Sequence, residues 1–363
     1  MRGAIDVPPI VDIGPFVAPG SFTDNERECC ALQFDAAMRS AGIATIVGHN
    51  VNAELIANLE QSARDFFGLD HKTKMKSWAG AFFRERGGFS SMRQEKVSNQ
   101  GSGESSSEDK WVDPLESFSY LLRGGQPSED QIFPTEPVIL NELAQRYISE
   151  ANRLCCILWR ISAYILGLPA DYFEETLPQS GKCFRMSHYP ADKTGQLEGQ
   201  PRKPAHTDLL GYTILRPDPQ VHGLEAQFKP GEWTPIVPPA APGLVVLAGD
   251  LVERWTCARW RACMHRVVHP TDHKELRARL SLIMFTGPDD DEVTIDALPT
   301  CRDATYSHPE MGITVRDKLM QAMKSTRSKI DEGARGAQVS RSSPVSPDLS
   351  SSSQRAQGIS SSA

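Results

Sequence analysis

Three side chains able to bind a metal occur in the second half of the chain: His206, Asp208 and, much further on, His265. Apolar, β-prone residues follow His206 and Asp208, which are two positions apart. Side chains at i and i+2 of a strand point to the same face, so we expect these two to converge. Two imidazoles and one carboxylate that leave other positions open form the facial triad of mononuclear non-haem iron(II) sites. The sequence therefore predicts a metal site at His206, Asp208 and His265.

A second pair with this spacing, Arg279 and Ser281, lies in an apolar run that reads as a later strand. An arginine fork matches a carboxylate in bidentate geometry, and a serine hydroxyl adds a donor. A carboxylic-acid site beside an iron site indicates a 2-oxo acid cosubstrate. Taken singly, these residues read as a packed core histidine or a surface arginine. Their order along the chain favours a metal site beside a carboxylate site: an H-x-D motif, a long gap, a second histidine and then R-x-S.

Short segments around these residues follow one another in a recognisable order: Gly223-Leu224-Glu225, Gly231-Glu232-Trp233, Pro242-Gly243, Gly249-Asp250-Leu251, Arg254-Trp255-Thr256 and His265-Arg266-Val267-Val268. In them the chain resembles the isopenicillin N synthase-like family of Fe(II)/2-oxoglutarate dioxygenases, over most of residues 5–325. The resemblance implies a double-stranded β-helix, or jelly roll. It implies iron at the three predicted ligands and the far carboxylate of 2-oxoglutarate at Arg279 and Ser281. It also implies a cosubstrate contact from Tyr189, and one from Ser187, where the family commonly has asparagine.

The expected fold class is α+β with a mainly β core: a jelly roll braced by helices, with an N-terminal α/β region. Short β-prone runs separated by turns such as Pro230-Gly231 favour a jelly roll over a parallel sheet. Strands are expected at residues 10–13, 43–47, 183–190, 212–215, 223–228, 233–237, 244–247, 263–268 and 280–286. Apolar spacing and caps predict helices at about residues 24–40, 53–67, 138–166, 171–177 and 315–329.

We expect five segments along the chain. They are an N-terminal non-haem dioxygenase region (5–125), bracing helices (126–178), the dioxygenase jelly-roll core (179–290), a C-terminal helical segment (291–333) and a disordered tail (334–363). The tail is rich in Ser, Pro, Gly and Gln and lacks aromatic residues, a composition typical of disorder.

Several residues have two interpretations, as pocket or as packing. The stretch 78–124 shows no clear periodicity, and Phe89, Arg93 or Phe118 within it either helps form the substrate pocket or packs ordinarily. The same choice applies to Tyr212, Leu224 and Phe285. The charged segment 71–76 is predicted to be a solvated face. Two histidines are expected to be structural: His49 in a turn, and His188 on the opposite face of its strand from Tyr189.

Composition narrows the class of protein. The chain has 363 residues and a formal net charge of -7, which gives no electrostatic footprint for nucleic acid or an anionic membrane. No apolar run approaches the ~20 residues of a membrane span, and the N-terminus lacks the apolar region of a signal peptide. Eight cysteines without a Cys-x-x-Cys pair read as reduced thiols. We expect a cytoplasmic monomer with a small-molecule substrate.

The implied activity is oxidation of a small organic metabolite, as in secondary metabolism. Fe(II) and O₂ would be used, and 2-oxoglutarate would be converted to succinate and CO₂, with ascorbate as an optional reductant. Hydroxylation and desaturation both remain open, whereas Asp208 argues against halogenation because a halide needs its ligand position. Two alternatives remain: an oxidase of the same fold that uses no 2-oxoglutarate, and a non-catalytic module that binds a small ligand. No Gly-rich phosphate loop, G-x-S-x-G elbow or H-E-x-x-H motif is present.

Overall fold

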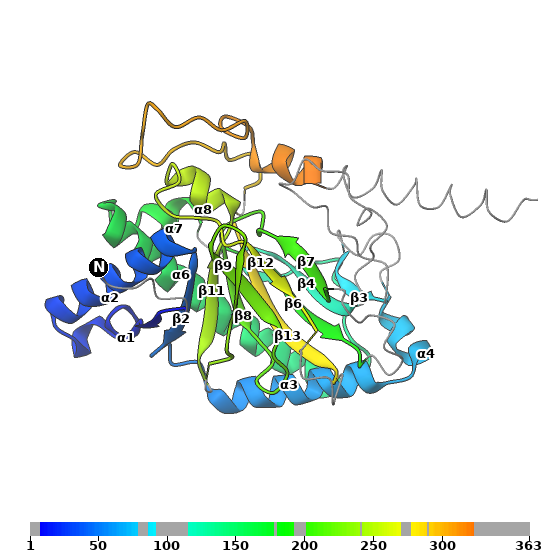
Figure 1. Cartoon of the computed structure of the whole chain (residues 1–363). Helices are drawn as coiled ribbons and strands as arrows, with labels where there is room; N and C mark the ends of the chain where they lie inside the picture. The colour runs from blue at the N-terminus through cyan, green and yellow to red at the C-terminus, as the bar shows by residue number, and fades with distance from the viewer. Residues whose placement is uncertain are drawn as a thin grey trace, which may run out of the picture.

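The computed structural model describes residues 8–78, 86–91, 115–177, 180–191, 201–239, 242–269, 277–288 and 290–322. Two β-sheets form its centre (Figure 1). The larger sheet has the strand order β1-β2-β11-β8-β13-β6-β4-β3, with β5 paired to β4, and the smaller has the order β10-β9-β12-β7. All pairings are antiparallel except β1 with β2. The predicted jelly-roll core is confirmed.

The strands of the larger sheet are β1 (Ile10–Asp12), β2 (Ile43–Val47), β3 (Gly88–Ser90), β4 (Glu116–Arg123), β5 (Gln126–Pro127), β6 (Gly181–Tyr189), β8 (Tyr212–Arg216), β11 (Leu244–Ala248) and β13 (Arg279–Thr286). Those of the smaller sheet are β7 (Lys203–His206), β9 (Leu224–Lys229), β10 (Glu232–Pro235) and β12 (His265–Val267). The helices are α1 (Gly14–Val17), α2 (Asp24–Ser40), α3 (Ala53–Gly68), α4 (His71–Lys74), α6 (Val138–Leu166), α7 (Tyr172–Thr176) and α8 (Asp250–Trp255), with 3-10 turns at Pro19–Ser21 and Met75–Ser77.

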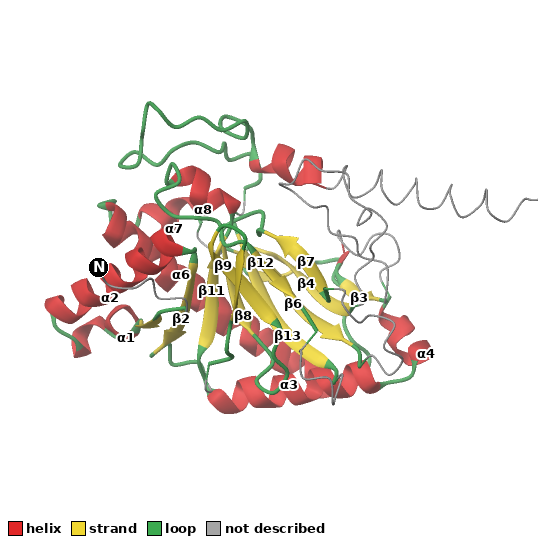
Figure 2. Ribbon diagram, viewed as in Figure 1, coloured by secondary structure: helices red, strands yellow, loops and turns green. Residues whose placement is uncertain are grey.

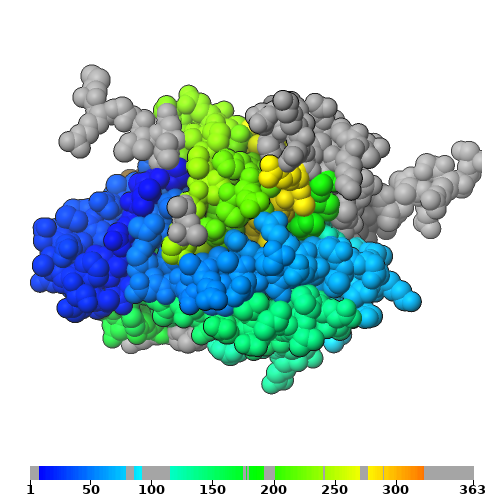
Figure 3. All heavy atoms as spheres, turned by 90° about the horizontal axis from the view of Figure 1, so that it is seen from below, coloured from blue at the N-terminus to red at the C-terminus, as the bar shows by residue number. Residues whose placement is uncertain are grey.

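Helices α2, α3 and α6 cover one side of the larger sheet (Figure 2), and the view from below shows α3 and α6 crossing that side (Figure 3). Their ends match the predicted signals. Thr23 caps α2 through a capping box with Glu26, and Gly167 ends α6 in the left-handed conformation, with φ of 67°. Their buried apolar faces form one continuous core with the larger sheet.

The packing of β3 and β4 corrects two interpretations of the segments 71–76 and 78–124. Phe89 and Phe118 are fully buried and pack edge-on against Phe66 of α3, so neither lines a pocket. The segment 71–76 is not wholly a solvated face. Lys74 is buried, with its Nζ 2.7 Å from Glu116 Oε2, because β4 brings a carboxylate over α4. Arg93 lies outside the described residues.

The other expected helices and strands are present, and the structure adds elements that were not expected: α1, α4, α8, β3, β4, β5 and β7. A helix begins at Val315 and continues to residue 322, the last described residue, so its predicted extension and the tail lie outside the described part. Gly249 precedes α8 as its N-cap, and the helix begins at Asp250. All eight cysteines are free thiols. None of the described helices has the length and apolar character needed to cross a membrane.

Candidate active site

The three predicted metal ligands converge between the sheets. His206 is the last residue of β7 and pairs in register with His265, the first residue of β12, so their rings lie 4.2 Å apart between centroids. Asp208 approaches the same point, and the ligand atoms of the three residues all lie within 4.8 Å of one another. Within the described part of the chain, no other group of three or more His, Cys, Asp or Glu side chains is arranged in this way.

The route by which Asp208 reaches the site differs from the prediction. Asp208 does not share a strand with His206 but lies in the connection after β7. The reason is that most of this connection bonds to the start of α8, and only at its end does the N–H of Gly211 donate to the carbonyl of Thr286 in β13. The N–H of Asp250 donates to the carbonyl of Asp208 at 2.8 Å, and the N–H of Leu251 donates to that of Leu210 at 3.1 Å. Main-chain bonds therefore hold the carboxylate in place.

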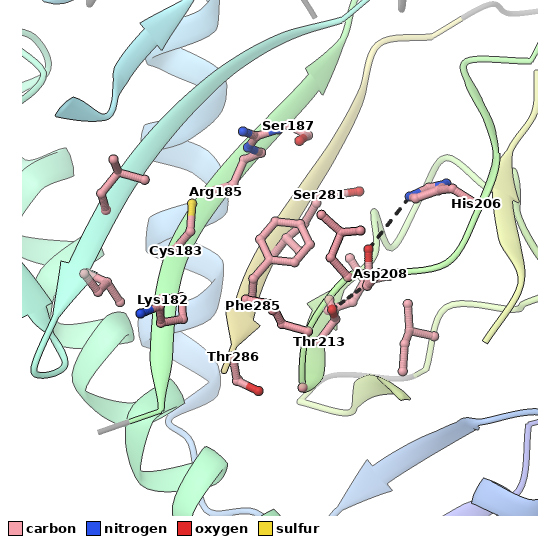
Figure 4. Close-up of a pocket in the computed structure, with 18 of the residues that line it drawn as sticks. Lys182, Cys183, Arg185, Ser187, His206, Asp208, Thr213, Ser281, Phe285 and Thr286 are labelled. Atoms are coloured by element: carbon pink, nitrogen blue, oxygen red, sulfur yellow. Dashed lines mark hydrogen bonds and ion pairs between the residues drawn. The ribbon is translucent and has the colours of Figure 1, made fainter. Parts of the chain in front are cut away.

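Figure 4 shows the contacts that join His206, Asp208 and Thr213. Hydrogen bonds to the two histidines define which of their atoms can bind a cation. Nδ1 of His206 lies 2.8 Å from the carbonyl of Pro204, and Nδ1 of His265 lies 3.0 Å from that of Cys263. A carbonyl only accepts, so each Nδ1 carries the proton and each Nε2 keeps its lone pair. Both imidazoles are therefore oriented as metal ligands.

Asp208 is held in a similar way. The hydroxyl of Thr213 on β8 donates to Oδ2 of Asp208 at 2.5 Å, while Oδ1 lies 3.9 Å from Nε2 of His206. Burial, followed by the nearby charge of His265, lowers the pKa of His206 well below its ordinary value. His206 is therefore neutral near neutral pH, which is the state that binds a metal. Two imidazole nitrogens and one carboxylate oxygen fit a ferrous ion with open positions.

The four predicted cosubstrate residues lie side by side on β6 and β13. Arg279 pairs in register with Tyr189, and Ser281 pairs with Ser187. Arg279 is 1% exposed, donates from Nη1 to Ser281 Oγ at 2.6 Å and lies 5.6 Å from the centre of the Tyr189 ring. Burial lowers the pKa of Arg279, against the opposing influence of Tyr189 and Asp218.

The Arg279 guanidinium lacks a full set of partners. Its Nε has no hydrogen-bond partner among the described residues, and no described carboxylate forms an ion pair with it. A buried arginine without a counter-ion is costly unless an anion completes the site. The arrangement therefore fits a carboxylate ligand beside the metal site.

A cavity of about 930 Å³ joins the two sites. Leu224 and Phe285 line it, as one interpretation of the sequence had it. Tyr212 is buried in the core, with its hydroxyl 2.8 Å from Ser162 Oγ, so its pocket interpretation is wrong. Thr213 was missed because its role depends on the loop after β7, which no local pattern reveals. Helix residues from 316 to 322 also line the cavity.

The two expected structural histidines lie outside the site. His188 faces away from the cavity, stacks on Phe67 and has Nδ1 3.0 Å from Glu116 Oε1. His49 is fully buried in the turn after β2, with Nε2 2.9 Å from the carbonyl of Pro242.

An antiparallel jelly roll with a His-Asp-His cluster and a buried arginine defines a non-haem iron oxygenase of the 2-oxo acid type. The comparisons agree. Residues 180–288 match the model of the 2OG-Fe(II) oxygenase superfamily, and residues 8–128 match that of the non-haem dioxygenase N-terminal region named for morphine synthesis. The chain belongs to the 2OG-Fe(II) oxygenase superfamily and is a non-haem Fe(II)/2-oxoglutarate-dependent dioxygenase.

Individual relatives cover most of the chain. Validamycin A dioxygenase of Streptomyces hygroscopicus subsp. limoneus is 28% identical over 97% of this chain and 95% of its own length. Flavanone 3-dioxygenase 2 of Oryza sativa subsp. japonica is 29% identical over 74% of this chain and 75% of its own. The crystal structure of a full-length Neurospora crassa protein in complex with alpha-KG has a TM-score of 0.75 at 24% identity, covering 88% of this chain and 96% of that one.

Proposed function

We propose that His206, Asp208 and His265 bind the Fe(II) of this dioxygenase, and that Arg279 and Ser281 bind the far carboxylate of its 2-oxoglutarate. The single observation that carries this proposal is the convergence of all five side chains on one cavity. Bound iron supplies the chemistry in which O₂ oxidises a substrate C–H bond while 2-oxoglutarate is converted to succinate and CO₂.

The protein's own residues prepare this reaction. The backbone carbonyls of Pro204 and Cys263 fix the tautomers of the two histidines, and Thr213 orients the Asp208 carboxylate. We propose that Tyr189 and Ser187, which pair with Arg279 and Ser281 across β6 and β13, complete the cosubstrate site. Apolar side chains from both sheets keep water from the reacting atoms, and the cavity volume suits a small organic substrate.

The test separates iron binding from cosubstrate binding. Anaerobic protein with Fe(II) and 2-oxoglutarate should show a weak visible charge-transfer band, which His265→Ala should abolish. His222→Ala, which removes an exposed loop histidine, is the matched control and should keep the band. Arg279→Ala should weaken 2-oxoglutarate binding far more than iron binding. An unaltered band in His265→Ala would refute the ligand assignment.

Succinate formation tests the rest of the proposal. Stoichiometric succinate during substrate oxidation is expected, whereas oxidation without succinate would indicate the oxidase alternative. Mass analysis of the product distinguishes hydroxylation from desaturation.

We also propose a cytoplasmic monomer that acts on a metabolite and not on nucleic acid, with the five-segment organisation expected above. Free cysteines and the net charge of -7 support this. Size-exclusion chromatography with light scattering tests the oligomeric state, and limited proteolysis tests the segment boundaries.

A further inference from the structure

The wall of the cavity carries an arginine that the iron and cosubstrate sites do not use. Residues of β6 at every second position face the cavity, and they include Ser187 and then Arg185. Ser187 pairs with Ser281, whereas Arg185 pairs with Ile283, one step further along the same strands. Two strand residues span about 7 Å, so Arg185 lies next to the cosubstrate residues without being one of them. Figure 4 shows Arg185 and Ser187 projecting from β6.

The orientation of Arg185 is defined by its neighbour on β4. Its Nε donates to Oγ of Ser119 at 3.1 Å, and the two residues are register partners across β4 and β6. This bond sets the plane of the guanidinium within the cavity wall. A guanidinium in a defined plane is a directional receptor for a carboxylate, which it binds through two parallel hydrogen bonds.

The charge of the cavity favours an anion. The whole chain has a net charge of -7, but the described lining of the cavity is mainly basic. Besides Arg279 and Asp208, it contains five basic side chains and two acidic ones: Arg123, Lys182, Arg185, Lys203 and Arg316, and Asp290 and Asp291. The charges within the proposed iron and cosubstrate sites sum to zero when one counts iron(II), the Asp208 carboxylate, the Arg279 guanidinium and doubly charged 2-oxoglutarate. Two of the five basic side chains form ion pairs: Lys182 Nζ lies 3.0 Å from Asp291 Oδ1, and Arg316 Nη1 lies 2.8 Å from Glu292 Oε1. The described lining still carries more basic than acidic groups, which favours an anionic substrate in the cavity.

Much of the remaining lining is apolar. Leu121 and Phe285 both pair with Cys183, the next cavity-facing position of β6 beyond Arg185. Leu210, from the segment after β7, and Leu319, from the C-terminal helix, also line the cavity. A substrate that fills this space needs an apolar body to match these surfaces, and one anionic group to match the arginine.

We propose that the substrate is an organic acid with an apolar body, whose carboxylate binds Arg185. The apolar body then occupies the space between Arg185 and the metal ligands. Arg185 is thus a specificity-determining residue. This inference rests on the proposed function of the site.

The experiment compares acids with their uncharged amides. Phenylacetate, phenylpropionate, phenylbutyrate and their primary amides are titrated into anaerobic protein loaded with Fe(II) and 2-oxoglutarate. Binding is read from the change in the charge-transfer band, and turnover from succinate release in air. We expect at least one acid to bind about tenfold to a hundredfold more tightly than its amide, as is typical of a charge-assisted hydrogen-bond pair.

Three variants identify the residue responsible. Arg185→Gln should abolish the preference for the acid, and Arg185→Lys should restore part of it. Arg146→Gln, which removes an exposed arginine on α6, should leave the preference unchanged. The titration of 2-oxoglutarate itself should be the same in all four proteins, and circular dichroism should show equal folding.

The outcomes are separable from those for the iron site. Equal binding of every acid and its amide by wild-type protein, or no detectable binding of any, would overturn the substrate class. A preference that survives in Arg185→Gln would overturn the role of Arg185. If Arg185→Gln weakens 2-oxoglutarate binding enough to explain its weaker binding of the acids, Arg185 is a cosubstrate residue, and its proposed role in substrate binding is also overturned. Absence of the band in wild-type protein would instead contradict the proposed function.

Discussion

A buried lysine joins the C-terminal helix to α8, whose first residue bonds to the main chain of Asp208, and we expect its removal to affect both stability and metal binding. Lys318 is 2% exposed, and its Nζ lies 3.1 Å from Asp250 Oδ2 and 2.6 Å from Glu310 Oε1. The main-chain N–H of Asp250 in turn donates to the carbonyl of Asp208 at 2.8 Å. Lys318→Met keeps the apolar stem of the side chain and removes the charge that its two partners face.

The size of the effect follows from burial. The Asp250 side chain is 8% exposed, so losing its cation leaves a buried, uncompensated carboxylate, which costs about 3–5 kcal/mol. Glu310 retains an interaction with Arg254 at 3.3 Å and is 22% exposed, so the lower end applies. We expect a loss of about 3 kcal/mol in the free energy of unfolding, which lowers Tm by about 4–5 °C in a chain of this length.

The effect should reach the metal site through α8. If Asp250 shifts toward water, the bond from its N–H to Asp208 lengthens, and the affinity for iron should fall about tenfold, as is typical when the support of a ligand is lost. Urea unfolding of metal-free protein measures the stability change, and anaerobic Fe(II) titration measures the affinity change. The matched control is Lys76→Met, which breaks an exposed pair with Glu136 at 3.5 Å and should cost less than about 1 kcal/mol.

A second variant distinguishes charge from packing. In a Lys318→Met background, Asp250→Asn removes the stranded carboxylate and should recover more than about 1 kcal/mol relative to Lys318→Met alone. If Lys318→Met unfolds at the wild-type urea concentration, or if Asp250→Asn recovers nothing, the argument from the buried ion pair is wrong.

Three further predictions concern the metal ligands and the pH dependence of folding. Thr213→Val removes the donor to Asp208 and should lower Fe(II) affinity about tenfold in anaerobic titrations, with little change in Tm. Burial raises the pKa of Glu116, but hydrogen bonds from His188 and Lys74, together with their charges, hold this pKa below its ordinary value. The ionised Glu116 therefore contributes to stability above about pH 4.5, and this contribution is lost as the pH falls through the lowered pKa. Glu116→Gln should therefore flatten the loss of stability in urea titrations at acid pH, and an unchanged slope would contradict this. Adding Fe(II) at a hundred times its Kd should stabilise the protein by about 2.7 kcal/mol, reversed by a chelator; equal Tm values with and without chelator would contradict it.

Elements with local signals were predictable from the sequence. Helix α6 was predicted at residues 138–166 and runs over Val138–Leu166, because apolar residues recur at helical spacing between Pro137 and Gly167. The grouping of His206, Asp208 and His265, and of Arg279 with Ser281, agrees with the prediction, while the roles of these residues stay predictions. The short spacings H-x-D and R-x-S are local signals, whereas His265 lies far along the chain and was assigned from residue type and motif order.

Strand β4 could not be predicted because both of its faces are buried. One face meets the helices and the other meets the cavity side of the sheet, so Ser117 and Ser119 are as inaccessible as Phe118 and Tyr120. The short polar–apolar alternation of these four residues therefore does not separate an exposed face from a buried one. Its polar groups are satisfied only by distant residues. Glu116 pairs with Lys74, and the amide of Gln131 donates to the carbonyl of Ser119 at 3.0 Å.

Asp208 shows how a correct prediction can rest on the wrong local geometry. Strand alternation predicted that it would converge with His206, and it does, but from a loop whose backbone is bonded to the start of α8. Gly249 makes this approach possible. A Cβ at that position would lie 2.4 Å from the carbonyl oxygen of Leu210 and 2.9 Å from that of Asp208. The place of the carboxylate therefore depends on close backbone contact between two segments that are distant in the sequence, which side-chain alternation within either segment cannot express.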